Sequence, residues 1–267
     1  MQQTFLPATA LVTGATSGFG RAIAQHIAQH FGWDLVITGR RADRLQALAV
    51  ELQTAYGIRV FTRAFDVRDK AQTAAAITGL EGEMRHPLRV LVNNAGLAAG
   101  LAPIDEGELS DWDQMIDTNL KGLLYVTHAV LPHLKAAGGA HIVNIGSTAA
   151  KLVYRNANVY SATKAAVDSL SQGMRIDLLP YGIKVTAVHP GAAETEFSEV
   201  RFKGDIARAE KVYEGFTPLY AEDVAQTVGY CLSLPAHVCI NDLTMTCLTQ
   251  ANGFYSIKAA DLKGPQS

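Results

Sequence analysis

Cysteine is scarce in this sequence, and the few that occur follow no pattern. The 267 residues include three, Cys231, Cys239 and Cys247, an odd number without a C-x-x-C pair. This indicates neither a disulfide framework nor a cysteine-based zinc site and fits a reduced compartment, so we expect a cytoplasmic protein. The sequence also lacks a basic leader with a cleavage site and any run of about 18 apolar residues, which argues against secretion and against a membrane span.

Charge of either sign is also in short supply. Charged residues make up 18% of the chain, the formal net charge is −2 and the pI is about 6.4. No block of five like charges occurs, so we expect no nucleic-acid partner and no membrane partner. Hydrophobic residues reach 48%, which is enough to build a large core.

What the sequence does contain is an alternation of short apolar runs with helical stretches. We predict strands at Thr9–Gly14, Asp34–Gly39, Arg59–Val67, Arg89–Gly96, His141–Ser147, Ile183–Gly191 and Leu243–Gln250. We predict helices at Gly18–Phe31, Arg41–Tyr56, Asp69–Met84, Trp112–Leu134, Ala221–Leu234 and from Asn158 to about Pro180. Repeated strand–helix units predict one α/β domain over residues 1–267, a doubly wound parallel sheet of about seven strands with helices on both faces. Residues 194–217 form a long polar connection, which we expect to be a mobile segment that covers the substrate.

A glycine-rich turn, "TGATSGFG" (Thr13–Gly20), joins the first predicted strand to its helix. Such glycines let the backbone approach a pyrophosphate, and the helix N-terminus then faces the phosphates with its partial positive charge. An ordinary tight turn is the alternative, but the position between strand and helix favours nucleotide binding. No Gly-Lys-Ser/Thr follows, so the turn is not a P-loop. The predicted contacts to the cofactor from this turn are Gly14, Thr16, Ser17, Gly18, Phe19 and Gly20.

The end of the second predicted strand indicates which dinucleotide would bind. In NAD-binding folds, an acidic residue about 20 positions after the glycines holds the ribose hydroxyls. Here "TGRR" supplies Arg40 and Arg41 instead. Because a guanidinium pairs with a phosphate through two hydrogen bonds, we predict NADP, with both arginines at its 2′-phosphate. The alternative is that the two arginines only solvate the start of the next helix.

The stretch "NVYSATKAAVDSL" places Tyr160 and Lys164 one helical turn apart, on one face. A free phenol has a pKa near 10, and lowering it to about 7 requires about 4 kcal/mol. A cation at about 4 Å, in an effective dielectric of about 20, supplies roughly that amount. Lys164 would therefore make Tyr160 an acid/base group. On this pair alone, a core tyrosine beside a snorkelling lysine is the favoured alternative.

Further motifs decide between these alternatives. They are TGATSGFG, "DV" at Asp66–Val67, "NNAG" at Asn93–Gly96, Asn119 in "DTNLKG", Ser147 in "NIGS", Tyr160-x-x-x-Lys164 and "PG" at Pro190–Gly191. In this order and spacing the chain resembles the short-chain dehydrogenase/reductase family over nearly its whole length. The resemblance implies a Rossmann-like domain, an oxidoreductase, NADP as cofactor, no metal and a homotetramer.

The resemblance also implies a role for each matching residue. Tyr160 would donate or accept the proton, Ser147 would orient the substrate oxygen, and Lys164 would bind the nicotinamide ribose and lower the phenol pKa. Asn119 would hold a water in a proton relay. The remaining predicted cofactor contacts are Asp66 and Val67 at the adenine, Asn94, Ala95 and Gly96 along the adenine ribose, and Pro190, Gly191 and Thr195 at the nicotinamide. In oxidation, the Tyr160 phenolate would take the alcohol proton while hydride leaves for the nicotinamide.

A narrower resemblance concerns the substrate. Stretches such as "ITGRRADRL", "NNAGLAAG", "TEFSEVRFKGD" and "LPAHVCIND" are similar to the NADP-dependent 3-hydroxy acid dehydrogenases. That group oxidises serine and related 3-hydroxy acids and reduces malonic semialdehyde. A carboxylate substrate needs a cation, for which the candidates are Arg201, Lys203 and Arg155, with Ser147 at the reacting oxygen. The alternatives are a broad carbonyl or 3-oxoacyl reductase and a non-catalytic NADP-sensing protein.

Overall fold

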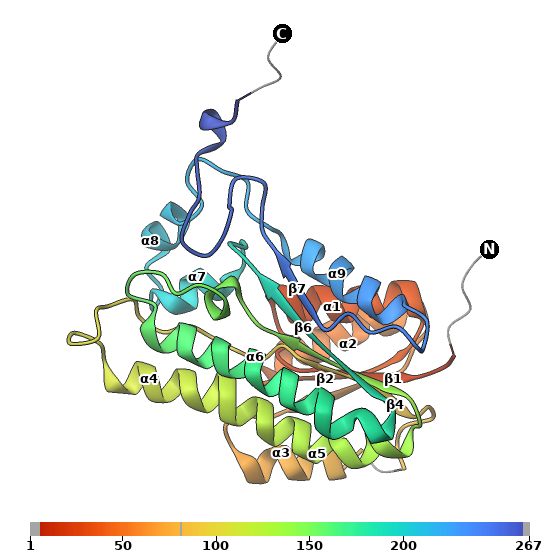
Figure 1. Cartoon of the computed structure of the whole chain (residues 1–267). Coiled ribbons are helices and arrows are strands. Elements are labelled where there is room, and N and C mark those ends of the chain that lie inside the picture. Colours follow the sequence, from red (N-terminus) through yellow and green to blue (C-terminus); the bar gives the residue numbers. More distant parts are fainter. Residues whose placement is uncertain (1–5, 81, 264–267) are drawn as a thin grey trace.

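A seven-stranded parallel sheet forms the centre of the molecule (Figure 1). The computed structural model describes residues 6–80 and 82–263. The strands are β1 (Thr9–Val12), β2 (Asp34–Gly39), β3 (Val60–Ala64), β4 (Leu88–Asn93), β5 (Ala140–Ile145), β6 (Ile183–Pro190) and β7 (Asp242–Met245). Their order across the sheet is β3-β2-β1-β4-β5-β6-β7, and each neighbouring pair is parallel. The predicted fold class is confirmed.

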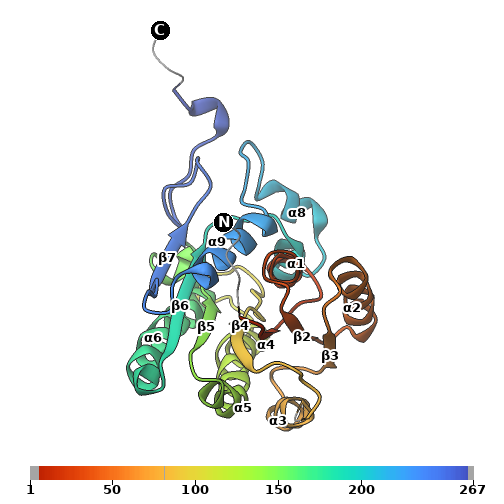
Figure 2. The same ribbon diagram turned by 90° about the vertical axis from the view of Figure 1, so that its right-hand side faces the viewer.

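Helices cover both faces of this sheet. They are α1 (Gly18–Phe31), α2 (Ala42–Tyr56), α3 (Lys70–Thr78), α4 (Leu109–Ile116), α5 (Leu123–Ala136), α6 (Asn158–Leu178), α7 (Glu196–Arg201), α8 (Ile206–Lys211) and α9 (Ala221–Ser233). Shorter helical turns are η1 (Asp117–Gly122), η2 (Thr148–Ala150), η3 (Leu179–Tyr181) and η4 (Ala259–Asp261). Helices α1, α2 and α9 lie on one side, and α3, α5 and α6 lie on the other (Figure 2).

The central strands β1, β4 and β5 are mostly apolar because both of their faces are covered. All six residues of β5 are buried, and β1 and β4 are nearly as enclosed. Strand side chains alternate between two apolar clusters, one on each face of the sheet. Ile37 of β2 packs in the cluster that includes Ile23 of α1, and Leu91 of β4 packs in the cluster that includes Val130 of α5. The sheet is therefore a rigid platform with its carboxyl ends at one edge.

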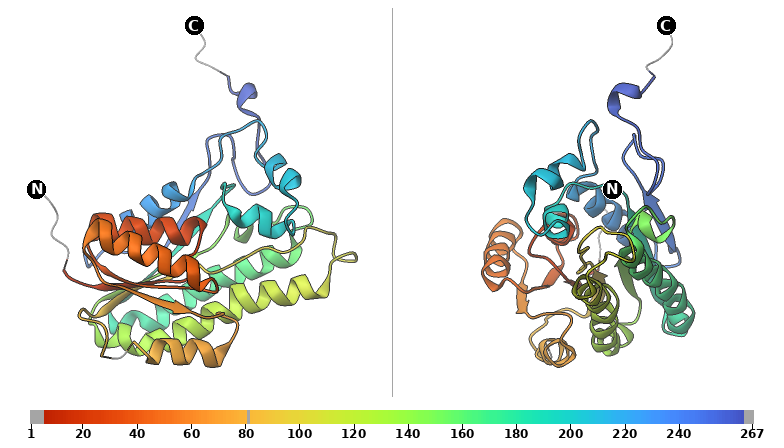
Figure 3. Two further views of the ribbon diagram at one scale, coloured as in Figure 1. Left: turned by 180° about the vertical axis from the view of Figure 1, so that it is seen from behind. Right: turned by 90° about the vertical axis from the view of Figure 1, so that its left-hand side faces the viewer.

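The strand order reverses between β1 and β4, where the chain crosses from one half of the sheet to the other. Ligands of doubly wound folds bind in the crevice at the carboxyl ends of the strands next to such a reversal. Helices α7 and α8, from the predicted covering segment, lie beyond this edge of the sheet (Figure 3). The topology thus brings the glycine turn after β1, the loop after β4 and the covering segment to one place.

Several predicted boundaries are wrong for local reasons. The helix predicted over Trp112–Leu134 lies within an unbroken helical stretch from α4 through η1 to α5, and its internal π-helical turn η1, where the Leu97 backbone holds the Asn119 side chain, was not predicted. The helix predicted to reach Met84 ends at Thr78, where Gly79 caps it. Within the described residues, no helix combines the length and the apolar character that crossing a membrane requires.

Candidate active site

A cavity of about 470 Å³ opens at the carboxyl edge of the sheet, between the glycine turn and α7. It brings together most of the residues that the sequence singled out. Those lining it are Gly14, Thr16, Ser17, Gly18, Phe19, Arg40, Arg41, Asp66, Val67, Asn94, Ala95, Gly96, Ser147, Tyr160, Lys164, Pro190, Gly191, Thr195 and Arg201. Residues from the carboxyl ends of strands β1 to β6 and from helices α6 and α7 therefore converge on one space.

The glycine turn is fastened to the loop that follows β4. Gly14 has a φ of +67°, which favours glycine, and a Cβ there would press on Ala95 and the Asn94 amide. The Asn94 side chain donates to the carbonyl oxygen of Thr13 at 2.8 Å, and the Thr13 hydroxyl accepts from the backbone N–H groups of Asn94 and Ala95. Asn94 thus holds the two loops together as well as lining the cavity.

Two predicted site residues, Gly20 and Asn119, stand behind the cavity rather than in its wall. A Cβ on Gly20 would overlap the Gly14 carbonyl, so this glycine lets α1 pack against the turn. The Asn119 amide bonds the N–H and the C=O of Leu97, both at 2.8 Å, and reaches the Thr163 hydroxyl at 3.1 Å. Cofactor contact by Gly20 and the water relay through Asn119 both stay predictions.

Tyr160 lies almost fully buried near the start of α6, and its phenol is hydrogen-bonded to Ser147. Ser147 ends the loop after β5 and caps η2, because its Oγ accepts from the Ala149 N–H at 3.1 Å. The serine hydroxyl and the phenol therefore face the same point in the cavity. This is the geometry expected of two groups that bind one substrate oxygen.

Lys164 lies one turn further along α6, with 6% of its surface exposed. Its ammonium donates to the Ile145 carbonyl oxygen at 2.9 Å, and burial lowers the pKa of this group to about 8. Burial raises the pKa of Tyr160 to about 12, while the Arg201 guanidinium opposes that rise. In this structure loss of hydration outweighs the nearby charges, and the cation that lowers the pKa of Tyr160 is Arg201 rather than Lys164. A lowering by Lys164 together with an oxidised nicotinamide stays a prediction.

Arg201, at the end of α7, lies over the aromatic floor of the cavity. Its Cζ is 5.0 Å from the centre of the Tyr160 ring and 5.4 Å from that of Phe197. Its Nη2 donates to the Tyr154 hydroxyl at 2.6 Å, whereas its buried Nε has no hydrogen-bond partner among the described residues. A cation with a free buried N–H beside Tyr160 is suited to hold an anionic group of the substrate.

The other two carboxylate-binding candidates lie elsewhere. Lys203 pairs with Glu108 at 3.0 Å and Asp111 at 3.1 Å, at the surface, and Arg155 is exposed. Neither lines the cavity, although both are described. Of the three predicted cations, the structure therefore retains only Arg201 at the site.

At the opposite end of the cavity, Arg41 connects the glycine turn to α7. Its guanidinium donates to the hydroxyls of Thr16 and Ser17, both at 2.9 Å, and to Glu196 at 3.0 Å. Arg44 donates to the same carboxylate at 2.8 Å. Burial alone would raise the pKa of Glu196. The hydrogen bonds from Arg41 and Arg44 lower it by more, so the net pKa lies below its usual value and the carboxylate is charged.

Asp66, after β3, lines the cavity with its carboxylate held by Arg68. Two guanidinium nitrogens reach it, the nearer at 2.6 Å, and these bonds lower the pKa of Asp66. Arg40 is exposed at the cavity rim. The predicted adenine end of the site is thus rich in guanidinium groups.

Several lining residues escaped sequence reasoning. They are Tyr154, Glu196, Phe197, Tyr213 and Gln250. Tyr213 donates to the Ala193 carbonyl oxygen at 2.7 Å, and Gln250 accepts from the Ala192 N–H at 2.8 Å. Both brace the segment after β6, and only the fold brings them there. Of these residues, only Tyr154 could have been suspected from the sequence, because it is a bulky side chain shortly after Ser147.

Comparisons with known proteins agree with this arrangement. A family model described as short chain dehydrogenase matches residues 8–205, and the chain belongs to that family. It is 48% identical to sulfoacetaldehyde reductase 2 of Chromohalobacter salexigens, over 92% of this chain and 97% of the relative. It is 47% identical to the NADP-dependent 3-hydroxy acid dehydrogenase YdfG of Salmonella typhi, over 90% and 95%. The closed form of a serine dehydrogenase complexed with NADP+ matches with a TM-score of 0.85 and 43% identity, over 97% and 100%.

Lys164 allows a test of the electrostatics described above. Because burial lowers its pKa from 10.5 to about 8, the charged form destabilises the folded chain below about pH 8, and this penalty vanishes above pH 10.5. We expect Lys164→Met to gain stability relative to the wild type, by about 3 kcal/mol, as the pH falls from 10.5 to 7. Denaturant titrations at both pH values measure this difference.

The exposed Lys135, replaced by Met, is the matched control and should show no such dependence. A stability difference for Lys164→Met that stays constant between the two pH values would contradict the assigned desolvation.

Proposed function

We propose that this chain is an NADP-dependent oxidoreductase that transfers a hydride between the nicotinamide and a small 3-hydroxy acid or the corresponding aldehyde. The observation that carries the proposal is the convergence of Tyr160, Ser147, Lys164 and Arg201 at one end of a cavity whose other end holds the glycine turn. Two groups for a carbonyl or hydroxyl oxygen lie there beside one cation for an acid group.

The described residues fit NADP. The glycine turn lines the cavity and leads into the N-terminus of α1 at Gly18, which suits a pyrophosphate. Arg40 at the rim and Arg41 beside Thr16 would hold the 2′-phosphate, and Lys164 would meet the nicotinamide ribose. When bound, NADP supplies or accepts the hydride.

The chain's own residues then handle the proton. In reduction, the neutral Tyr160 phenol donates its proton to the substrate oxygen while the Ser147 hydroxyl orients that oxygen. In oxidation the phenol must ionise, and the Arg201 guanidinium favours this change. Lys164, with a pKa near 8, exchanges a proton readily at neutral pH.

Arg201 supports an acidic substrate. Its unpaired Nε–H and the Tyr154 hydroxyl bonded to Nη2 would together hold a carboxylate near the reacting carbon. A sulfonate meets the same donors, and one relative at 48% identity is named a sulfoacetaldehyde reductase, so sulfoacetaldehyde is a second candidate substrate. The broad carbonyl or 3-oxoacyl reductase does not need this cation, and a sensor without turnover does not need the Tyr160–Ser147 pair.

Several broader features complete the proposal. The chain would act as one domain over residues 1–267, with the segment 194–217 covering the substrate, which the contacts of α7 with both ends of the cavity support. A cytoplasmic location is supported by three free thiols. A homotetramer is supported by exposed apolar side chains on and after α6, Ile176 and Leu179 among them.

Replacing Tyr160 with phenylalanine tests the reaction. We expect Tyr160→Phe to lower kcat for malonic semialdehyde reduction by at least about a hundredfold, because the proton donor is gone. NADPH binding, followed by quenching of protein fluorescence, should be retained. Tyr181→Phe, at an exposed tyrosine, is the control. A Tyr160→Phe enzyme that keeps substantial kcat would refute the role.

Replacing Arg40 tests the cofactor. We expect Arg40→Ala to raise the Kd for NADP by about tenfold and to leave the Kd for NAD nearly unchanged, since a charge-assisted bond to the 2′-phosphate is lost. Calorimetric titration of both nucleotides measures this, with the exposed Arg59→Ala as control. Equal weakening of the two nucleotides would mean that Arg40 does not contact the 2′-phosphate.

Replacing Arg201 tests the substrate class. We expect Arg201→Met to lower the ratio of kcat/KM for malonic semialdehyde to that for propanal by about tenfold or more, because propanal lacks the acid group. Arg155→Met, at an exposed arginine outside the cavity, should leave the ratio unchanged. An unaltered ratio in Arg201→Met would exclude the anion clamp.

A further inference from the structure

A buried histidine lies directly behind the serine of the site. His189 is the penultimate residue of β6 and is 0% exposed. Its Nδ1 lies 3.3 Å from the backbone nitrogen of Ser147 and 3.2 Å from the Ser147 carbonyl oxygen. A Cβ on Gly146 would overlap this ring, so only glycine before Ser147 leaves room for it. His189 therefore supports the backbone from which the Ser147 hydroxyl projects.

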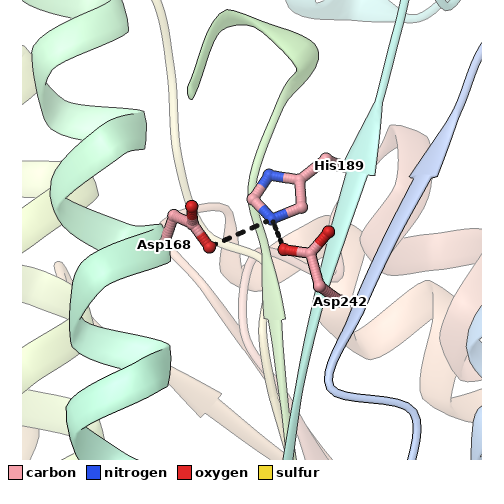
Figure 4. Close-up of side chains that lie close together, drawn as sticks. All are labelled: Asp168, His189 and Asp242. Carbon is pink, nitrogen blue, oxygen red and sulfur yellow. Dashed lines mark ion pairs between the residues drawn. The ribbon is translucent and has the colours of Figure 1, made fainter. Parts of the chain in front are cut away.

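The far side of the ring faces two carboxylates (Figure 4). His189 Nε2 is 3.1 Å from Oδ2 of Asp242 on β7 and 3.6 Å from Oδ1 of Asp168 on α6. Lys151, just after η2, bridges the same carboxylates, with its Nζ 2.9 Å from Asp168 and 2.6 Å from Asp242. The chain thus supplies its own cation to this pair of acids, so the cluster is an ionic network that does not require a metal.

The position of the proton on the ring follows from these neighbours. Nδ1 lies close enough to Ser147 either to accept from its N–H or to donate to its carbonyl oxygen. The carboxylates decide between the two neutral tautomers, because a bare Nε2 would face their negative oxygens; they favour the proton on Nε2 and a bare Nδ1 that accepts the Ser147 N–H. That proton then faces the negative oxygens of Asp242 and Asp168. Within the described residues, Nε2 has no well-aligned hydrogen-bond partner, so its attraction to the carboxylates is chiefly electrostatic.

We propose that His189 is a positioning residue for the proposed reduction, which holds the Ser147 backbone through Nδ1 while Asp168, Asp242 and Lys151 fix its ring in the neutral tautomer. The kinetic test of this inference rests on the proposed function, because it measures aldehyde reduction. The Ser147 hydroxyl is hydrogen-bonded to the Tyr160 phenol. A shift of the Ser147 backbone therefore misplaces both hydroxyl groups that would bind the substrate oxygen.

Protonation of His189 would change this arrangement, because a protonated Nδ1 no longer accepts from the Ser147 N–H and would donate to the Ser147 carbonyl oxygen instead. The charged groups that face the ring are Lys151, Asp242 and Asp168, from the three elements packed against it. Burial and Lys151 lower the pKa of His189, whereas the two carboxylates and the Ser147 backbone raise it, and the net pKa lies below the usual range. Activity should therefore be lost as the pH falls through this pKa.

Two variants at the edge of the network should move this pKa in opposite directions. Removing the cation, in Lys151→Met, should raise the pKa of His189, and removing a carboxylate, in Asp242→Asn, should lower it. Both side chains are about one-third exposed, so neither replacement opens the core. The acid limb of the kcat profile for aldehyde reduction should shift to higher pH in the first variant and to lower pH in the second. Reduction is the direction to use, since a neutral Tyr160 is then the active form.

Replacements of the ring itself separate positioning from packing. His189→Asn can keep an acceptor near the Nδ1 position without a titrating group, so it should retain most of kcat and lose the acid limb. His189→Leu offers no acceptor and should lower kcat about tenfold with KM for NADPH unchanged, the cost of one buried N–H left unpaired. If His189→Leu fails to fold, the Lys151→Met and Asp242→Asn pair still decides the matter.

A second readout does not depend on turnover. The NMR titration of the His189 imidazole, assigned by comparison with His189→Asn, reports its pKa in the wild type and in both edge variants. Opposite shifts of that pKa, matched by the acid limbs, support the proposal. An active wild type whose acid limb is the same in all variants overturns it. An enzyme that is inactive on every acidic aldehyde overturns the proposed function instead. In that case, opposite shifts of the His189 pKa in the two edge variants would still support the arrangement of the ring.

Discussion

Loss of hydration at the Tyr160 phenol is the constraint on which the rest of the site depends. Because burial removes its hydration, the phenol has a higher pKa than in water, and the Arg201 guanidinium only partly offsets this rise. The same dryness makes the Lys164 ammonium costly to keep charged. A phenol that stays neutral at physiological pH is ready to donate a proton, which suits reduction. Oxidation demands that it ionise, and the Arg201 guanidinium favours the phenolate.

One short helix reaches both ends of the cavity. At the start of α7, Glu196 pairs with Arg41 and Arg44 beside the glycine turn. At its end, Arg201 lies over Tyr160 and is bonded to Tyr154. A phosphate bound by Arg41 would compete with the Glu196 carboxylate for the same guanidinium. These ion pairs are about 40% exposed and individually weak, which lets them rearrange at small cost.

The sequence predicted the fold well because strand and helix patterns repeat with short connections. The glycine turn, Tyr160 and Lys164 were identifiable because their chemistry depends on spacing within one helix or one turn. The packing role of Gly20 was not predicted, because a glycine required for packing and one required for a ligand look the same in a motif.

What the sequence could not provide was the balance of burial against charge around Tyr160. That balance depends on Arg201, which is 41 positions away in the chain and is brought over the ring by the covering segment. The His189 network was missed for the same reason, since Lys151, Asp168, His189 and Asp242 come from four separate elements. Local patterns carry no information about such long-range electrostatic neighbours.

The most direct test of this account is the ionisation of the Tyr160 phenol itself. Ultraviolet difference spectra between the wild type and Tyr160→Phe, titrated with alkali, isolate this one tyrosine. The account predicts a pKa near 12 in the free protein and a lower value once oxidised NADP brings positive charge to the ring. A phenol that ionises near pH 7 in the free protein, or one whose pKa is unmoved by the oxidised cofactor, would contradict it.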